Sequence, residues 1–371
     1  MSGVTLLREE GGRPVETAMT LCADRTPAPR PFSAVARLLS MTSTACALVL
    51  ASLLAQSPDL PARLTKTLDS LAAAGEFSGV FLLAKDGAPL LERAYGFADR
   101  EARTANTLET AFNIGSINKF FTQIAIRQLA DAGKLDVDST LARAWPDYPN
   151  HEVARRVTIR QLLQHRSGVG GNIFAAPPGK TRGDIRQLAD YLPLFVNEPL
   201  QFEPGTNQRY SNAGYIILGL LVERLSGENY YDYVRRHVFE PAAMTRTASW
   251  TVDALPANTA IGYTTGGVDA ETPSSGSAVP NTKILPGRGS SAGGGYSTAH
   301  DLLRLVNALR AGKIPSGPPS GIGIAGGAPG LNAAVEGDLP GGYDVIVLAN
   351  LDPPAAERVA RIVRGWLGAR D

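Results

Sequence analysis

The hydrophobic and polar positions in the first third of this 371-residue chain follow two different periods. Residues 60–74 have the leucine spacing of an amphipathic helix. One stripe of that helix would carry Leu60, Leu64, Leu68 and Leu71. Gly79–Lys85 and Pro89–Phe97 have the character of strands, and Asp86-Gly87 between them is a strong signal for a tight hairpin turn. The sequence therefore predicts a helix followed by a β-hairpin.

Helical periodicity dominates the middle of the chain. A helix is predicted to begin near Ser116 and to end at Gly133, because apolar residues recur at the helical repeat between them. Gly214–Leu225 is predicted to be an apolar helix closed by Gly227. A further capped helix is predicted to begin near Ser297.

A second hairpin is predicted near the C-terminus, from Leu331–Glu336 and Tyr343–Asn350, with a terminal helix over Ala355–Leu367. Two hairpins at opposite ends of the chain, with helices between and outside them, indicate one antiparallel sheet assembled from both termini. The predicted fold class is α+β, a two-lobed α/β arrangement. A mainly helical lobe of about residues 135–300 would lie beside the sheet, with a cleft at the junction.

The N-terminal segment has the pattern of an export signal. Residues 1–40 lack periodicity, and Met41 is followed by an apolar run over residues 45–55, too short to span a bilayer but suited to a signal-peptide core. We expect a signal peptide at 41–57, a non-structural extension at 1–40 and a single domain at 58–371. The protein would be secreted or periplasmic, without stable membrane insertion after signal removal; a frayed amphipathic helix is the alternative.

Composition excludes several other functions. The formal net charge is +1, from 36 basic and 35 acidic residues, and no basic stripe interleaves with aromatics, so nucleic acid is not an expected partner. Both cysteines, Cys22 and Cys46, precede the expected cleavage point, so the mature chain would lack thiols. The four histidines show no ligand spacing, and His165 is predicted to be a structural hydrogen-bonding residue. We expect neither a metal nor a cofactor.

Ser116-Ile117-Asn118-Lys119 carries the first candidate chemistry. Residues three apart share a helix face, so the Lys119 amine can reach the Ser116 hydroxyl. Lysine can act as the base that serine needs if burial lowers its pKa, and Phe120 and Phe121 are predicted to supply apolar cover. The backbone N–H of Ser116, at a helix start, could bind an oxyanion. So short a motif also arises by chance.

Tyr210-Ser211-Asn212 supplies the second candidate group, in a loop after Pro204-Gly205 and directly before an apolar helix. A phenol near an ammonium can relay a proton from nucleophile to leaving group, and an amide can hold both substrate and lysine. Without Ser116, an ordinary helix-entry loop would be the favoured explanation of this triplet.

Together these motifs resemble the serine β-lactamase and penicillin-binding protein superfamily, in the branch of class C β-lactamases, D-alanyl-D-alanine carboxypeptidases and related esterases. The resemblance runs from about Phe77 to the C-terminus. Besides the two motifs above, it is carried by Leu162–Gly168, Pro204-Gly205, Pro241, Met244, Gly293–Ala299 and Asp301. It implies a β-lactamase/transpeptidase-like fold and an acyl-enzyme mechanism without a cofactor. Ser116 would be the nucleophile, Lys119 and Tyr210 the proton-transfer pair, and Asn212 a substrate ligand.

The chain departs from the family's third motif, which is Lys or His, a small residue and Gly. The matching position is Ile324-Ala325-Gly326, so the cation is missing, although the backbone N–H of Gly327 could still complete an oxyanion hole. Losing a charge-assisted contact to a substrate carboxylate costs roughly 1.5–3 kcal/mol. Lys283 and Arg288 are the nearest replacement cations in sequence. Only a short segment, from Lys313 to Ile324, precedes this strand, so part of the sheet is expected to be missing.

The sequence therefore predicts a serine hydrolase of small esters, amides or β-lactams, with ester hydrolysis favoured over β-lactam hydrolysis. Ser116, Lys119 and Tyr210 would be catalytic, and Asn212 with the Gly326-Gly327 pair would bind substrate. The alternative is a catalytically impaired relative that binds cell-wall peptides or β-lactams. Gly289–Gly293 also matches a nucleophile elbow and Gly321–Gly326 a dinucleotide fingerprint, but neither has the strand and helix context that those motifs require.

Overall fold

The computed structural model describes residues 60–266, 276–315, 317 and 322–368. The extension expected at residues 1–40, the signal peptide expected at 41–57 and both cysteines lie outside these residues. From Thr65 onward, the described residues belong to one compact unit. In the described part of the chain, no helix combines the length and the apolar character needed to cross a membrane.

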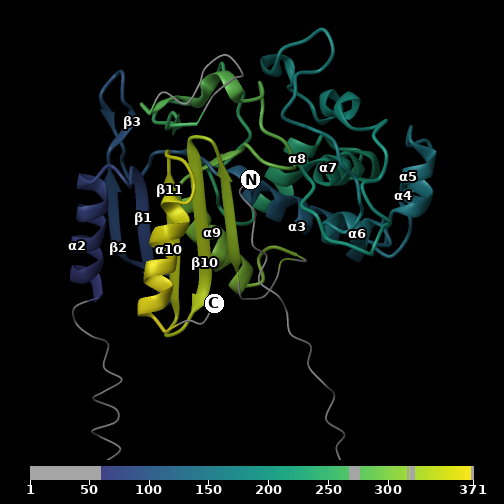
Figure 1. The fold of residues 1–371 in the computed structure, drawn as a ribbon. Helices are drawn as coiled ribbons and strands as arrows, with labels where there is room; N and C mark the ends of the chain where they lie inside the picture. Colours follow the sequence, from purple (N-terminus) through teal and green to yellow (C-terminus); the bar gives the residue numbers. More distant parts are fainter. Residues whose placement is uncertain (1–59, 267–275, 316, 318–321, 369–371) are drawn as a thin grey trace, which may run out of the picture. The chain divides into compact units, whose positions relative to one another are not determined.

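A five-stranded antiparallel sheet joins the two ends of this unit (Figure 1). In spatial order its strands are β2 (Ala88–Tyr95), β1 (Gly79–Lys85), β11 (Tyr343–Ala349), β10 (Leu331–Leu339) and β9 (Gly323–Ala328). The N-terminal hairpin meets the C-terminal hairpin where β1 pairs with β11, with Gly79 opposite Ala349. This confirms the prediction of one antiparallel sheet assembled from both termini.

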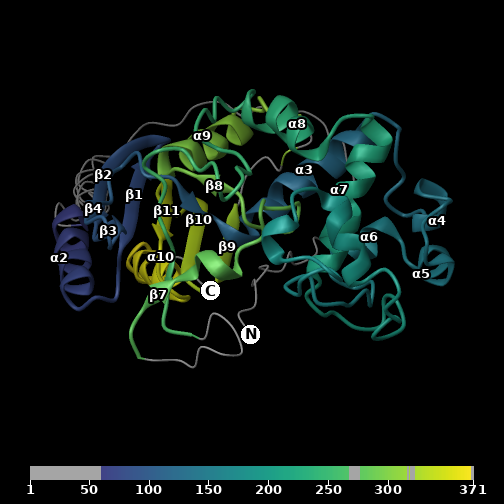
Figure 2. The same cartoon turned by 90° about the horizontal axis from the view of Figure 1, so that it is seen from above.

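The central strands are apolar on both faces because helices cover both sides of the sheet. Val80–Ala84 of β1 and all of β11 are buried. Helix α10 (Ala355–Trp366) contacts β10 and β11, whereas α9 (Ala299–Arg310) contacts β11 and β1 from the opposite face (Figure 2). A continuous apolar run is the pattern expected of a strand buried on both faces.

The helical lobe is built around α7 (Asn212–Ser226), which is buried from Ala213 to Val222 and packs against α3 (Asn118–Asp131). Gly227 ends α7 in the left-handed conformation, with φ 77°.

The other α-helices of the described residues are α2 (Leu60–Ala73), α4 (Leu141–Ala144), α5 (His151–Arg156), α6 (Ile159–Leu163) and α8 (Tyr230–Val234). Short strand pairs are β3 (Phe97–Asp99) with β4 (Thr104–Ala105), β5 (Phe112–Asn113) with β8 (Tyr296–Ser297), and β6 (Tyr263–Thr264) with β7 (Val279–Pro280).

Two predicted helix starts are shifted by local geometry. The turn at Ser116 is a short 3-10 segment, Gly115–Ile117, and the α-helix begins at Asn118. Ser297 lies in β8, and the next helix is capped by Thr298, whose hydroxyl accepts a hydrogen bond from the Asp301 N–H. The pairing of β5 with β8 places Ser297 in a strand, so the next helix begins after it. The two strands are too far apart in the sequence for local periodicity to reveal their pairing.

The strand β9 forms one edge of the sheet. Between Arg310, where α9 ends, and Gly323, where β9 begins, the described residues contain no further strand. The residues matching the altered third motif therefore lie on an edge strand. Such a strand can present backbone groups to a ligand, because one of its two sides has no neighbouring strand.

Candidate active site

The four side chains singled out by the sequence come from two packed helices and the segments that precede them. Ser116 lies in the turn before α3, and Lys119 lies in the first turn of α3. Tyr210 ends an extended segment, and Asn212 is the first residue of α7. Because α3 packs against α7, residues about ninety positions apart meet at one point.

The distances within this group are those of a connected hydrogen-bond network. Ser116 Oγ lies 2.6 Å from the Tyr210 hydroxyl and 3.1 Å from Lys119 Nζ. Lys119 Nζ also donates to Asn212 Oδ1 at 2.8 Å and to the carbonyl oxygen of Ala292. The structure therefore brings together the predicted serine, lysine, tyrosine and asparagine.

Burial disfavours the charged form of the Lys119 amine. The side chain is 4% exposed, and desolvation lowers its pKa well below the ordinary value. A neutral amine has two N–H bonds and one lone pair. In that form, N–H groups directed at Asn212 Oδ1 and the Ala292 carbonyl would leave the lone pair for the Ser116 hydroxyl, which is the orientation that a base requires.

Tyr210 remains a phenol in the same site. Burial raises its pKa to about 12, although the hydrogen bond with Ser116 opposes this shift. A protonated hydroxyl 2.6 Å from Ser116 Oγ can donate to that oxygen while the serine proton points toward Lys119. This arrangement would allow Lys119 to act as a base and Tyr210 as a proton donor.

The apolar cover of the lysine differs from the prediction. The aromatic rings within 6 Å of Nζ belong to Tyr210, at 4.7 Å, and Tyr215, at 5.5 Å. Phe120 and Phe121 are buried in the core instead, where Phe121 packs edge-on against Phe239. Side chains directly following a helical lysine point to other faces of the helix, so sequence adjacency did not place them over the amine.

The loop at Gly289–Gly293, which lacks the context of a nucleophile elbow, contributes to the site through its backbone. Three successive carbonyls, of residues 290–292, accept hydrogen bonds from the first turns of α3: from Asn118 Nδ2 at 3.0 Å, from Thr122 Oγ1 at 2.8 Å, and from Lys119 Nζ. The Ser291 hydroxyl is buried and donates to the Tyr215 carbonyl. The elbow-like sequence at Gly289–Gly293 is therefore a docking loop for the lysine.

The Gly326-Gly327 pair lies against the turn that carries Ser116. A Cβ placed on Gly326 would lie 2.8 Å from the Ser116 backbone nitrogen, and one placed on Gly115 would lie 3.2 Å from the Gly327 nitrogen. The two N–H groups predicted to bind an oxyanion are therefore carried by adjacent backbone segments. Glycine is required at 326 because any larger residue would also clash with the Ile114 carbonyl.

Ile324, at the position of the missing cation, also has apolar surroundings. Ile324 is partly buried and packs against the hydrophobic core. Of the two replacement cations, Arg288 lies 3.5 Å from the centre of the Tyr231 ring and donates to the Ser249 carbonyl, and Lys283 is exposed. Among the residues that the structure describes, neither contacts the hydrogen-bond network of the candidate site.

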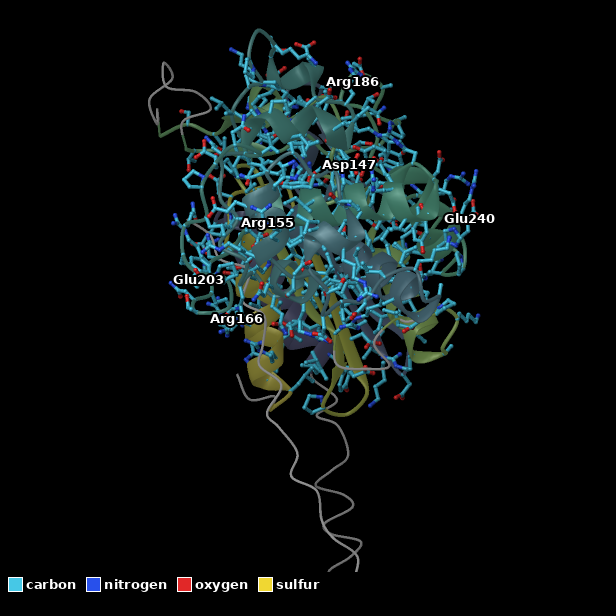
Figure 3. All side chains as sticks on the ribbon, turned by 90° about the vertical axis from the view of Figure 1, so that its right-hand side faces the viewer. Asp147, Arg155, Arg166, Arg186, Glu203 and Glu240 are labelled. Atoms are coloured by element: carbon cyan, nitrogen blue, oxygen red, sulfur yellow. The ribbon has the colours of Figure 1, made fainter. Side chains whose placement is uncertain are left out.

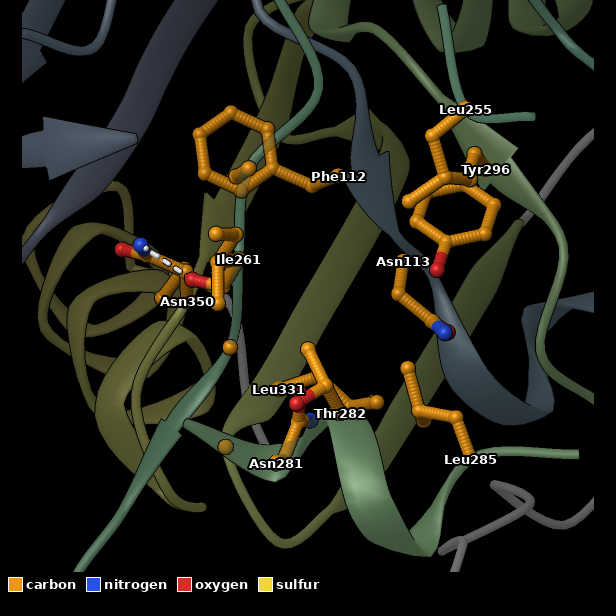
Figure 4. A pocket seen from close by; sticks show the side chains of 14 residues that line it. Phe112, Asn113, Leu255, Ile261, Asn281, Thr282, Leu285, Tyr296, Leu331 and Asn350 are labelled. Carbon is orange, nitrogen blue, oxygen red and sulfur yellow. Dashed lines mark hydrogen bonds between the residues drawn. The ribbon is translucent and has the colours of Figure 1, made fainter. Parts of the chain in front are cut away.

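Two concave sites lie outside this network. A small cavity of about 30 Å³ is lined by residues that include Asn113, Tyr296 and Leu331 (Figure 4). Asn113 also accepts a hydrogen bond from the Gly115 N–H. A pocket of about 240 Å³ lies on the helical lobe beside Arg156; Figure 3 shows Arg155, Arg166 and Glu203 on this part of the lobe.

Comparison with known proteins agrees with this geometry. The family model described as "Beta-lactamase" matches residues 64–320. The chain belongs to the beta-lactamase family. The family match ends before β9, so Ile324, Gly326 and Gly327 lie outside the matched residues.

Members of the penicillin-binding protein group are similar to this beta-lactamase family chain. The crystal structure of a penicillin binding protein from Bacillus halodurans has a TM-score of 0.69 and 31% identity, over 81% of this chain and 98% of that chain. Penicillin-binding protein 4 of Amycolatopsis lactamdurans is 31% identical, over 67% of this chain and 64% of that protein. Penicillin-binding protein PbpX of Bacillus subtilis is 29% identical, over 65% and 56%. The chain thus spans less than two thirds of these curated relatives.

Proposed function

We propose that this beta-lactamase family chain is a serine hydrolase that forms an acyl-enzyme on Ser116. One observation carries the proposal: Ser116 Oγ lies within hydrogen-bond distance of both Lys119, a buried amine with a lowered pKa, and a phenol, Tyr210. A nucleophile in contact with a base, and with a second proton donor, is the arrangement that covalent hydrolysis requires.

Acylation follows from these contacts. The Ser116 oxygen attacks the substrate carbonyl carbon while its proton passes to Lys119 Nζ, and the carbonyl electron pair moves to the oxygen. The backbone N–H groups of Ser116 and Gly327 stabilise that oxyanion. When the tetrahedral intermediate collapses, the bond to the leaving group breaks. The leaving group takes the Tyr210 proton, which Lys119 then replaces.

Deacylation uses the same groups in reverse. Water loses a proton to Lys119 as its oxygen attacks the acyl carbon, and the acyl–Ser116 bond then breaks with return of the proton to the serine oxygen. Asn212 keeps the amine oriented in both steps and offers its side-chain N–H₂ to the substrate. No cofactor is needed for this sequence of proton transfers.

The substrates that fit this site best are small neutral esters and amides. Ile324 provides an apolar side chain where the family pattern has a cation, and its packing against the core leaves no charge there to bind a carboxylate. We therefore propose ester hydrolysis in preference to hydrolysis of β-lactams or D-Ala-D-Ala peptides. The described residues supply no replacement cation within the network, which supports the same choice.

A serine-reactive fluorophosphonate and two chromogenic substrates test the proposal. The wild-type mature chain should be labelled at Ser116 and should hydrolyse p-nitrophenyl acetate with a higher kcat/KM than a chromogenic cephalosporin. Ser116→Ala should abolish both labelling and turnover, whereas Ser139→Ala, at a half-buried turn, should change neither. Labelling at another residue would refute the assignment. Absence of both labelling and turnover would favour a non-catalytic binding protein.

Export is a separate proposal that rests on the N-terminal sequence. The apolar run over residues 45–55 supports a signal peptide at 41–57 and a mature protein that begins near residues 56–58 and is secreted or periplasmic. N-terminal sequencing of material recovered outside the cytoplasm measures this directly. A cytoplasmic protein that retains Met1 would contradict it.

A further inference from the structure

His165 holds the segment that carries Tyr210. Its backbone carbonyl accepts a hydrogen bond from the Arg209 N–H at 2.9 Å, and its ring nitrogen Nδ1 accepts one from the Ser211 N–H at 3.1 Å. The two bonds fix the residues immediately before and after Tyr210. The sequence-based prediction that His165 is a structural hydrogen-bonding residue is confirmed, but its neighbours indicate a more specific role.

The His165 ring also packs on the tyrosine itself. Its centre lies 4.5 Å from that of Tyr210 and 5.0 Å from that of Tyr215, with planes tilted by 36° and 33°. The side chain is 4% exposed, so the ring is enclosed between α7, the Tyr210 segment and Lys119 of α3. Its position therefore constrains where the Tyr210 ring can lie.

The backbone at this position is in an unusual conformation for a histidine. His165 has φ 58°, in the left-handed region that non-glycine residues adopt at a cost. Such a conformation persists only where surrounding contacts hold it, and such residues cluster at functional sites. Here it allows the carbonyl and the ring of one residue to face the same neighbouring segment.

We propose that His165 is a positioning residue for the hydrolase reaction, keeping the Tyr210 hydroxyl in contact with Ser116 Oγ only while its own ring is neutral. This inference rests on the proposed function. Because Nδ1 is an acceptor, the neutral ring carries its proton on Nε2. A protonated ring would turn an N–H toward the Ser211 N–H and lose the bond.

Three titratable groups face the His165 ring. They are Lys119, from α3, and the two phenols, Tyr210 and Tyr215; the flanking arginines, Arg166 and Arg209, are exposed. Burial is the largest cause that lowers the pKa of His165 to about 4, and a positive charge on Lys119, when that amine is protonated, lowers it further. Acidification should therefore disconnect Tyr210 in addition to protonating Lys119.

Two substitutions distinguish the role of the His165 hydrogen-bond acceptor from the role of its aromatic ring. His165→Asn keeps a side-chain acceptor and tolerates positive φ, whereas His165→Phe keeps the ring and loses the acceptor. On p-nitrophenyl acetate we expect His165→Phe to lower kcat on the order of 10–100-fold with little change in KM, since a buried N–H is left unpaired. His165→Asn should lose less, and His237→Asn, at a surface ion pair, should match wild type.

The pH profile gives the readout that a purely structural role would not change. Below about pH 4 the wild type should lose kcat with a steeper acid limb than His165→Asn, because the variant retains only the Lys119 protonation. An equally steep limb in His165→Asn would overturn the inference, as would a wild-type kcat in His165→Phe. If Ser116→Ala is inactive while His165→Phe is unchanged, only this inference fails; if Ser116→Ala is fully active, the proposed function fails.

A measurement on the wild type does not depend on whether the variants fold. Nitrogen NMR of the four histidines, assigned through variants of His151, His237 and His300, should show His165 with a proton on Nε2 and neutral down to about pH 4. A His165 ring that carries its proton on Nδ1, or that titrates near the ordinary histidine pKa, would contradict the inference.

Discussion

The two walls of the candidate site contribute different chemical groups. The wall formed by α3 and α7 consists of side chains linked by hydrogen bonds, with Lys119 buried among Ser116, Asn212 and a loop carbonyl. The β9 wall contributes backbone, two glycines and the apolar Ile324. The first wall can supply proton transfer and the second only N–H groups and shape. Chemistry should therefore depend on the first wall, and substrate range on the second.

The largest effect is expected when Lys119, in the wall formed by α3 and α7, is replaced. Lys119→Ala should reduce acylation of Ser116 by at least about 10³-fold, close to the effect of Ser116→Ala, because groups that act as a unit lose their effect together. The double variant should lose no more than either single one. Burst-phase kinetics with p-nitrophenyl acetate measure this, and Lys134→Ala, at an exposed position after α3, is the control. Additive losses would contradict a shared proton-transfer role.

The next effect concerns the close approach of β9 to the serine turn. Gly326→Ala should lower kcat/KM on the order of 100-fold and destabilise the fold by about 1–3 kcal/mol, because its methyl group would meet backbone atoms that cannot rotate away. Gly365→Ala in α10 is the control, since a Cβ there meets nothing within 4 Å. Equal behaviour of the two variants in thermal melts and kinetics would show that β9 does not approach Ser116.

Restoring the family's cation on the β9 wall should change the choice of substrate more than the chemical step. Ile324→His should raise kcat/KM for a chromogenic cephalosporin by up to roughly 10–150-fold, the factor that corresponds to 1.5–3 kcal/mol for a charge-assisted contact. Hydrolysis of p-nitrophenyl acetate should change little, because that ester has no carboxylate. A similar rise for both substrates would mean that Ile324 limits the chemical step and not the choice of substrate.

The last effect is on the pH dependence of stability, and it again concerns the α3 and α7 wall. His165 has its pKa lowered from 6.5 to about 4, so the unfolded chain takes up a proton that the folded chain refuses. Its stabilising contribution is complete above about pH 6.5 and is lost as the pH falls toward 4, by up to about 3 kcal/mol. Urea unfolding across this range should show a shallower decline in His165→Asn. Parallel curves would contradict the lowered pKa.

The sequence predicted those parts of the site that local patterns mark. Ser116 and Lys119 open one helix and Tyr210 and Asn212 precede or open another, so periodicity and turn signals located all four. The Ala292 carbonyl escaped prediction because a backbone oxygen has no residue-type signature. The packing of His165 on Tyr210 also escaped it, since it depends on how α6 and α7 come together and not on the spacing within either helix.

The hairpins show the same limit in the fold. Both were predicted from strand-like runs and the turn residues between them, and their joining into one sheet was inferred from their places at opposite ends of the chain, with helices between and outside them. The register of β1 on β11 and the edge position of β9 required the structure, because pairing between distant strands leaves no periodic trace in either strand.

The pairing of β1 with β11 has a consequence for how the chain is made. Gly79 lies opposite Ala349, so the interior strand β1 gains its second neighbour only after about 270 further residues have been synthesised. Contacts of such sequence separation slow folding, and until they form, β1 exposes an apolar strand edge. A nascent or truncated chain that ends before Tyr343 should therefore remain unfolded and prone to aggregation. If the chain is exported as proposed above, this delay would keep it unfolded until it has crossed the membrane.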